Sequence, residues 1–280
     1  MKLATLRRNG TTAAVRIDAD QAVELGVPDV GVLLQDPDWP TRAAEADGTR
    51  HALDGIALAD WAPVVPRPGK IVCVGLNYRA HILEMGRELP EHPTLFSKYP
   101  EALIGPGDRI EVPGYAAGAL DWEGELAVVL GATVRRVSPQ EAGSRIAGYA
   151  VLNDFTMRDW QYRTHEWLQG KSFEGTTPFG PYLVTSDEWS PGPELRTVVN
   201  GETVQQVGTD DLLFAPDALV SYISRIFPLQ PGDVIASGTP GGVGHARKPP
   251  RYLVDGDVLE TFIDGLGAQR NDIVVTGDAG

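Results

Sequence analysis

The chain has 280 residues, of which 42% are apolar and 22% are charged, a composition typical of a globular protein. Its formal net charge of −14 excludes a general nucleic-acid binder, because phosphate contacts need a basic surface, although local cations could still bind a small anion. No apolar stretch approaches the roughly 20 residues of a membrane span. The N-terminal segment lacks an apolar signal core, so we expect a cytoplasmic protein without a membrane partner.

Residues 1–65 are predicted to form a small β-rich domain. Short alternating runs predict strands, and two further runs predict short helices: Lys2–Arg7, Thr12–Asp18 and Gln21–Leu25, then Val30–Leu34 and Thr41–Ala46. Residues 60–69 are rich in proline and resemble an extended linker. We therefore place a domain boundary near residue 65 and expect a second domain over residues 66–280.

The second domain is predicted to combine many strands with a few helices. The expected strands include Lys70–Leu76, Arg109–Val112 and Gly148–Asn153, and the expected helices are Asn77–Gly86, Ser138 to about Ile146, Thr156–Trp167 and Asp217–Phe227. The chain lacks a regular alternation of strand and helix. This pattern indicates an α+β protein that is mainly β and mostly antiparallel, and not a Rossmann sheet.

The segment Leu120–Gly131 is predicted to be one strand, and it carries Glu123 and Glu125 just before its apolar run. Successive side chains on a strand alternate between its faces, so Glu123 and Glu125 would share a face. A hard cation between the two carboxylates would remove their repulsion. The alternative is a solvated strand edge that carries two acids.

Asp154 follows the predicted strand Gly148–Asn153 and could join these two acids in a cleft. Three carboxylates form an all-oxygen site, which suits Mg²⁺, Mn²⁺ or Ca²⁺ rather than zinc. A divalent ion would leave this site at −1, so an anionic substrate needs a nearby cation such as Arg158 or Lys171. Residues 170–181 contain too much glycine and proline for a helix, and the alternative for Lys171 is an ordinary solvated loop lysine.

Two further segments carry candidate chemistry. His81 and Glu84 are three residues apart on a predicted helix, so Glu84 could orient the imidazole for activation of a water, although a surface pair explains the same spacing. Residues 238–244 form a glycine-rich loop after a strand, but the loop lacks the P-loop lysine and the following helix. Its backbone N–H groups and the Thr239 hydroxyl could still bind a carboxylate.

These motifs together resemble the fumarylacetoacetate hydrolase superfamily, in its short bacterial branch of acylpyruvate hydrolases and homoprotocatechuate-pathway isomerase/decarboxylases. The matching segments cover about residues 66–275 in the order of the family: Val74–Tyr78 with His81 and Glu84–Gly86, Asp121–Gly131, Asn153–Asp154 with Arg158–Gln161, Gly170–Phe173 with Pro178–Pro181, and Ser237–Val243. The resemblance implies a mixed β-sandwich roll and a homodimer.

The resemblance also implies roles for individual residues. Glu123, Glu125 and Asp154 would hold Mg²⁺, with Mn²⁺ or Ca²⁺ as alternatives. Lys171 would lie by the metal and the substrate, and His81 with Glu84 would form a water-activating dyad on a mobile lid. The residues expected to contact the substrate or the catalytic water are Tyr78, Arg158, Gln161 and Thr239.

The implied activity is the hydrolysis of a C–C bond in acylpyruvate-type 2,4-diketo acids, through a pyruvate enolate that the metal and Lys171 stabilise. The alternative on the same scaffold is a decarboxylase or keto–enol isomerase of oxaloacetate-type 2-oxo diacids. A non-catalytic metal- or ligand-binding protein is a third possibility. Trp122 and the bulky pair Ile82–Leu83 depart from the pattern of the family and leave the substrate open.

Overall fold

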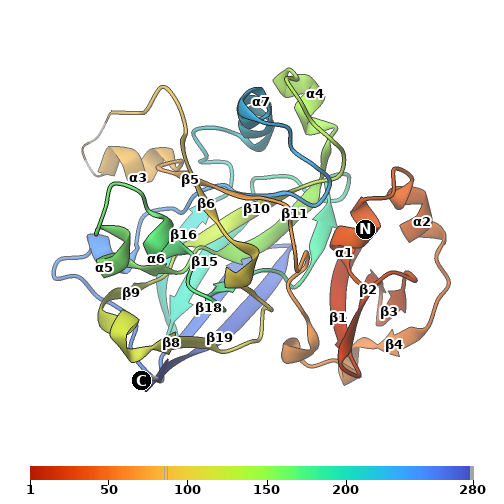
Figure 1. The fold of residues 1–280 in the computed structure, drawn as a ribbon, viewed down its shortest axis with the longest axis horizontal. Helices are drawn as coiled ribbons and strands as arrows, with labels where there is room; N and C mark the ends of the chain where they lie inside the picture. The colour runs from red at the N-terminus through yellow and green to blue at the C-terminus, as the bar shows by residue number, and fades with distance from the viewer. Residues whose placement is uncertain (85, 87, 278–280) are drawn as a thin grey trace.

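The structure is a computed structural model that describes residues 1–84, 86 and 88–277, and the side chains of His81 and Glu84 lie outside this description. Within the described residues, ten strands form one large sheet (Figure 1). Their order is β4 (Arg50–Ala52), β3 (Gln21–Glu24), β2 (Thr11–Asp18), β1 (Lys2–Arg8), β14 (Leu183–Thr185), β11 (Ile146–Asn153), β10 (Gly124–Leu130), β17 (Val234–Ala236), β5 (Ile71–Gly75) and β6 (Thr94–Lys98). The pairs are antiparallel except β17 with β5.

A second sheet packs beside the first and contains five of the described strands. Their order is β16 (Glu202–Gly208), β15 (Glu194–Val199), β18 (Val258–Ile263), β19 (Gly267–Thr276) and β8 (Ile110–Pro113). Two short ladders join β12 (Thr156–Met157) to β9 (Leu120–Asp121) and β13 (Thr177–Pro178) to β7 (Leu103–Ile104). The expectation of a mainly β, mixed and mostly antiparallel fold is confirmed.

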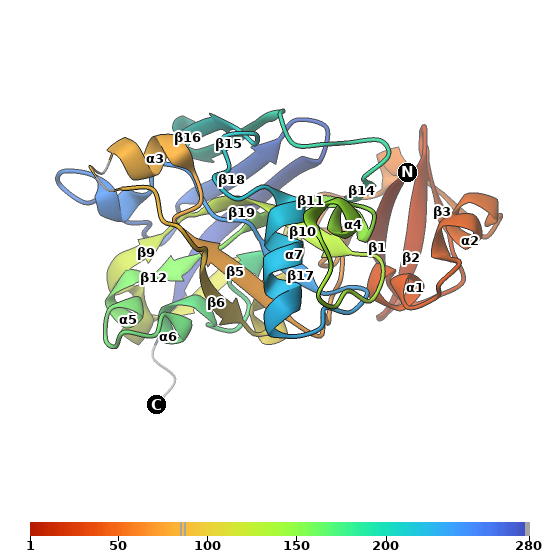
Figure 2. The ribbon, with the colours of Figure 1, turned by 90° about the horizontal axis from the view of Figure 1, so that it is seen from above.

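The helices are short and lie around the sheets. They are α1 (Val30–Leu34), α2 (Trp39–Glu45), α3 (Arg79–Glu84), α4 (Pro139–Gly143), α5 (Arg158–Gln161), α6 (Leu168–Lys171) and α7 (Pro216–Ile226). Figure 2 shows α4 and α7 side by side over the large sheet. Among the described residues, no helix is both long and apolar enough to cross a membrane.

Strand β10 is buried along its whole length and on both of its faces. Leu126 and Val128 belong to the core that also contains Ile223 of α7, whereas Ala127 and Val129 belong to the core on the opposite face. This alternation is that of a strand covered on both sides. Side chains near the start of β10 are therefore positioned by packing along its whole length.

Four local expectations were wrong. The segment 120–131 is two strands, β9 and β10, with a break at Trp122–Glu123, and the helix that begins after Ser138 ends at Gly143. Residues 156–167 are not one helix: Thr156 and Met157 pair with β9, and α5 ends at Gln161. Lys171 is the last residue of α6 and is not in a loop.

Residues 1–65 form the end of the large sheet that lies at the right of Figure 1. Strand β1 joins this end to the rest of the sheet, since Leu3 pairs with Leu183 of β14. The helix predicted at Val30–Leu34 has those bounds, and the second predicted helix begins two residues early, at Trp39. The domain boundary near residue 65 stays a prediction. The large sheet and its apolar core both continue across this position.

Candidate active site and metal centre

Three acidic side chains converge where β10 and β11 meet. Gly124 pairs with Asn153 across the two strands, and the Asp154 N–H donates to the Glu123 carbonyl oxygen at 2.8 Å. These contacts bring Asp154 beside the start of β10. Glu123, Glu125 and Asp154 then each place a carboxylate oxygen within 4.8 Å of the others. The structure therefore brings together the three residues that the sequence proposed as metal ligands.

Two buried lysines lie against this acidic group. Lys171 Nζ lies 2.7 Å from Glu123 Oε2 and 2.7 Å from Asp154 Oδ2. Lys98, the last residue of β6, places its Nζ 2.7 Å from Asp154 Oδ1 and also donates to the Phe155 carbonyl oxygen. Lys171 is 1% exposed, so it is not a solvated loop lysine, and the solvated alternative was wrong.

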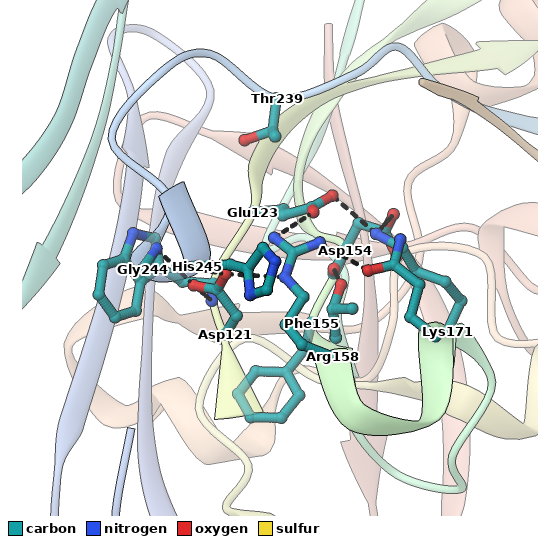
Figure 3. A network of polar contacts seen from close by, with 12 residues as sticks. Asp121, Glu123, Asp154, Phe155, Arg158, Lys171, Thr239, Gly244 and His245 are labelled. Atoms are coloured by element: carbon teal, nitrogen blue, oxygen red, sulfur yellow. Dashed lines mark hydrogen bonds and ion pairs between the residues drawn. The ribbon is translucent and has the colours of Figure 1, made fainter. Parts of the chain in front are cut away.

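Arg158 connects the acidic group to a second part of the site. Its Nε donates to Asp121 Oδ2 at 2.8 Å, and a terminal nitrogen lies 2.6 Å from Glu123 Oε1. The other terminal nitrogen donates to Gln161 Oε1 at 2.9 Å. Figure 3 shows the guanidinium between Asp121 and Glu123. The side chains of Arg158 and Gln161 thus hold each other at the wall of the site.

The loop over residues 238–246 covers the other side of the acidic group. The Gly238 N–H donates to Glu125 Oε2 at 2.9 Å, and the Thr239 hydroxyl donates to the Gly124 carbonyl oxygen. Farther along the loop, the N–H groups of Gly244 and His245 donate to the two oxygens of Asp121. Backbone donors of this loop therefore bind carboxylates of the protein itself at two places.

Burial and neighbouring charges shift several pKa values in opposite directions. Burial, Asp154 and Glu123 raise the pKa of Glu125 well above its ordinary value. Burial opposes ionisation of Asp154 too, but Lys171 and Lys98 outweigh it and hold the pKa of Asp154 below its ordinary value. Burial lowers the pKa of Lys171, but the charges of Asp154 and Glu123 raise this pKa by more than burial lowers it. The ammonium therefore stays protonated.

The charge of the whole cluster indicates which ligands it can accept. The buried charged groups in the described part of the site are Asp121, Glu123, Glu125, Asp154, Lys98, Arg158 and Lys171. Four negative and three positive charges leave a formal charge of −1. A divalent cation would change this to +1, and the site would then attract a small anion.

The donor set fits a hard divalent cation. Glu125 is 1% exposed, and among the described residues its carboxylate has a backbone N–H as hydrogen-bond partner and no cation in ion-pair contact. A buried carboxylate that two other acids flank is unfavourable unless a cation neutralises it. The oxygens of Glu123, Glu125 and Asp154 would hold the ion, and Mg²⁺, Mn²⁺ and Ca²⁺ all prefer such ligands.

The cluster opens into a cavity with a volume of about 410 Å³. Its lining combines charged, polar and aromatic side chains, including Phe96, Glu123, Glu125, Arg158, Gln161, Tyr162, Trp167, Lys171, Thr239 and His245. Of the predicted substrate-contacting residues, Arg158, Gln161 and Thr239 line this cavity. Tyr78 does not: it is fully buried, and its hydroxyl has no hydrogen-bond partner among the described residues.

Three residues of the site were not predicted from the sequence, and one predicted pair of side chains lies outside the described part of the structure. Lys98, Asp121 and His245 contribute to the site although the sequence did not single them out for it. His81 and Glu84 belong to α3, but their side chains lie outside the described part of the chain, so the proposed dyad stays a prediction.

A family model and a curated relative each match most of the chain. A family model described as the C-terminal part of fumarylacetoacetate (FAA) hydrolase matches residues 70–274. The mitochondrial oxaloacetate tautomerase fahd2 of Xenopus laevis is 39% identical over 238 residues, which cover 84% of this chain and 74% of the relative.

Solved structures extend the likeness over nearly the whole chain. The fumarylacetoacetate hydrolase of Exiguobacterium antarcticum has a TM-score of 0.88 and 33% identity and covers 99% of this chain and 100% of its own. A maleylpyruvate hydrolase of Sphingobium sp. SYK-6, in complex with manganese(II) and pyruvate, has a TM-score of 0.80 and 27% identity, with coverages of 99% and 100%. As its motifs predicted, the chain belongs to the fumarylacetoacetate hydrolase superfamily and is an enzyme of that superfamily.

Proposed function

We propose that this protein is a metal-dependent keto–enol tautomerase of oxaloacetate-type 2-oxo diacids. The observation that carries the proposal is the acidic group Glu123, Glu125 and Asp154 with the Lys171 ammonium in direct contact, at the base of one cavity. The relative named oxaloacetate tautomerase supports this reading over the hydrolysis of acylpyruvates that the sequence first suggested.

Tautomerisation moves one proton between C3 and the C2 oxygen of the substrate, and the negative charge of the enolate must be stabilised in between. A divalent cation held by the three acids would polarise the 2-oxo group and bind the adjoining carboxylate. Lys171 keeps its proton because its pKa is raised, so it acts as a donor towards the enolate oxygen and not as a base. His81, oriented by Glu84, is the proposed proton acceptor at C3.

The surrounding side chains hold the substrate and limit access of water. Phe96 and Trp167 pack with their rings 5.2 Å apart and form an apolar wall of the cavity. This wall disfavours water near the enolate, which would strengthen its interaction with Lys171. Gln161 is held by Arg158 and presents its amide to the cavity.

The test follows the enol absorbance of oxaloacetate with added Mg²⁺ or Mn²⁺ and again with EDTA. We expect metal-dependent loss of the enol without release of pyruvate, and Lys171→Met should lower kcat by roughly 10²–10³ while metal binding persists. Turnover that EDTA leaves unchanged would contradict the proposal.

Hydrolysis of acylpyruvates remains a second candidate, because the same scaffold occurs in the maleylpyruvate hydrolase that binds manganese and pyruvate. A panel of acylpyruvates, followed by loss of diketone absorbance, separates the two activities. Hydrolysis that is faster than the tautomerisation of oxaloacetate would favour the second candidate. Formation of pyruvate from oxaloacetate would instead indicate decarboxylation.

A further inference from the structure

His245 lies on the rim of the same cavity, away from Lys171. Figure 3 shows the two residues on opposite sides of the Arg158 guanidinium. Both line the cavity, so a molecule that lies along it would have one end at the acidic group and the other near His245. Sequence patterns alone did not assign a role to this histidine.

Contacts with three other residues hold His245 in place, and two of them are made by its exposed imidazole. Its own backbone N–H donates to Asp121 Oδ2 at 2.9 Å, which fixes the position of the residue. The Tyr252 hydroxyl lies 2.8 Å from the ring Nδ1, and the ring of Tyr162 lies beside the imidazole with centroids 5.1 Å apart. The contacts with Tyr252 and Tyr162 orient the ring at the rim of the cavity.

This arrangement leaves one nitrogen of the ring available. We assign the Tyr252 hydroxyl as the donor to Nδ1, because a phenol is a better hydrogen-bond donor than acceptor. The hydrogen of the neutral ring then resides on Nε2. Burial and the charge of Arg158 lower the pKa of His245, which keeps the ring neutral near pH 7. Nε2 has no hydrogen-bond partner among the described residues.

Two neighbouring side chains already donate their hydrogen bonds to protein atoms. Arg158 directs its three nitrogens to Asp121, Glu123 and Gln161, and Thr239 donates to a backbone carbonyl. Arg158 thus contributes positive charge to this end of the cavity but few free N–H groups. A second carboxylate of a substrate would find an unengaged donor in His245 Nε2–H.

We propose that His245 is the specificity-determining residue for the distal carboxylate of a dicarboxylic 2-oxo acid. Its Nε2–H donates a hydrogen bond to that carboxylate, while the 2-oxo acid end lies at the acidic group beside Lys171. This inference rests on the proposed function and assigns the recognition of its diacid substrates to one residue. Monocarboxylic 2-oxo acids with an apolar tail cannot accept this hydrogen bond, so they forgo its contribution to binding.

Binding of unreactive probes tests the inference separately from turnover. L-Malate and 2-hydroxybutyrate have the same chain length and differ in their distal group, a carboxylate in one and a methyl in the other. Calorimetry with the Mn²⁺-loaded protein gives both affinities for the wild type, His245→Leu and His245→Gln. His165→Leu is the matched control, because His165 is an exposed histidine outside the cavity lining.

We expect the wild type to bind malate at least about tenfold more tightly than 2-hydroxybutyrate. His245→Leu should abolish most of this preference by weakening malate alone, His245→Gln should retain part of it through its amide donor, and His165→Leu should retain all of it. An unchanged preference in His245→Leu overturns the inference, and so does an equal loss for both probes.

The kinetic arm compares oxaloacetate with its C4 methyl ester, which lacks the distal charge. His245→Leu should raise KM for oxaloacetate about tenfold with little change in kcat, and the ester should be unaffected. If kcat falls for both substrates, His245 transfers a proton and the inference is overturned. If oxaloacetate is not turned over but malate preference depends on His245, the inference stands and the proposed tautomerase fails.

Discussion

Glu125 is a residue whose environment favours a bound cation over a free carboxylate. Burial and the two neighbouring acids raise its pKa, so its ionised form destabilises the metal-free protein at neutral pH. Glu125→Gln keeps the shape and removes the charge. In EDTA we expect the variant to have a higher Tm than the wild type by a few degrees, at about 2–4 °C per kcal/mol for proteins of roughly this size.

The same variant should lose most of the rise in Tm that Mn²⁺ gives the wild type, because one of three ligands is gone. In EDTA, the difference in Tm between the variant and the wild type should shrink as the pH falls towards the raised pKa of Glu125, because the wild-type carboxyl then takes up a proton. Scanning calorimetry across pH measures both effects, with the exposed Glu174→Gln as control. A lower Tm for Glu125→Gln in EDTA would contradict this account of the site.

At the residue scale the sequence predicted the three acids that the structure brings together, but not all of the cations that balance their charge. Glu123 and Glu125 are close in sequence, and Asp154 follows a recognisable strand, so pattern and resemblance sufficed. Lys98 stands between Ser97 and Tyr99 without any motif, and its role follows from burial at the end of β6 against Asp154. Long-range packing of this kind leaves no local signal in the sequence.

At the element scale, the contact between α5 and α6 positions Lys171. A methyl group at Gly170 would lie 2.4 Å from the Gln161 backbone nitrogen and 2.5 Å from the Met157 carbonyl oxygen. Glycine at this position therefore allows α6 to pack directly on the backbone of α5. Gly170→Ala should push α6 away, destabilise the protein by about 1–3 kcal/mol and reduce kcat through the displaced ammonium.

Gly143→Ala is the matched control for this prediction, since a methyl group there meets no atom within 4 Å. It should leave kcat unchanged and alter stability by at most about 0.5–1 kcal/mol in the stabilising direction. Urea unfolding and steady-state kinetics measure both variants. Wild-type stability and kcat in Gly170→Ala would show that the packing of α6 on α5 is not needed.

Residues 156–167 show where the prediction of helices from local sequence fails. No glycine or proline lies in this segment, so local propensity favours one continuous helix. The structure instead pairs Thr156 with Asp121 and Met157 with Leu120, far apart in the chain. That pairing brings Arg158 beside Asp121, and no local preference in the sequence encodes it.

At the scale of the whole molecule, residues 1–65 are joined to the rest by backbone pairing and by a common core. Val30 and Leu33 of α1 belong to the same apolar cluster as Ala127 and Val129 of β10. Removal of residues 1–65 would expose this cluster and the edge of β14. We expect residues 66–280 alone to aggregate or to unfold without cooperativity.

Size-exclusion chromatography and urea unfolding of residues 66–280 check this expectation against the full chain. A monodisperse fragment with a cooperative transition would instead establish the two segments as independently folding domains. The boundary near residue 65 stays a prediction. The sequence did not predict that one sheet spans it, because strand pairing between distant segments depends on the assembled fold.

Asp121 receives hydrogen bonds from both Arg158 and the backbone of residues 244–245, so it fastens α5 and the rim loop to one common point. The span between the acidic group and His245 is consequently fixed by a buried anchor and is insulated from changes at the surface. An enzyme of this kind could adapt to longer or shorter substrates by exchanging side chains at the rim of the cavity. A shift of the backbone around Asp121 would instead disturb the acidic group and His245 together.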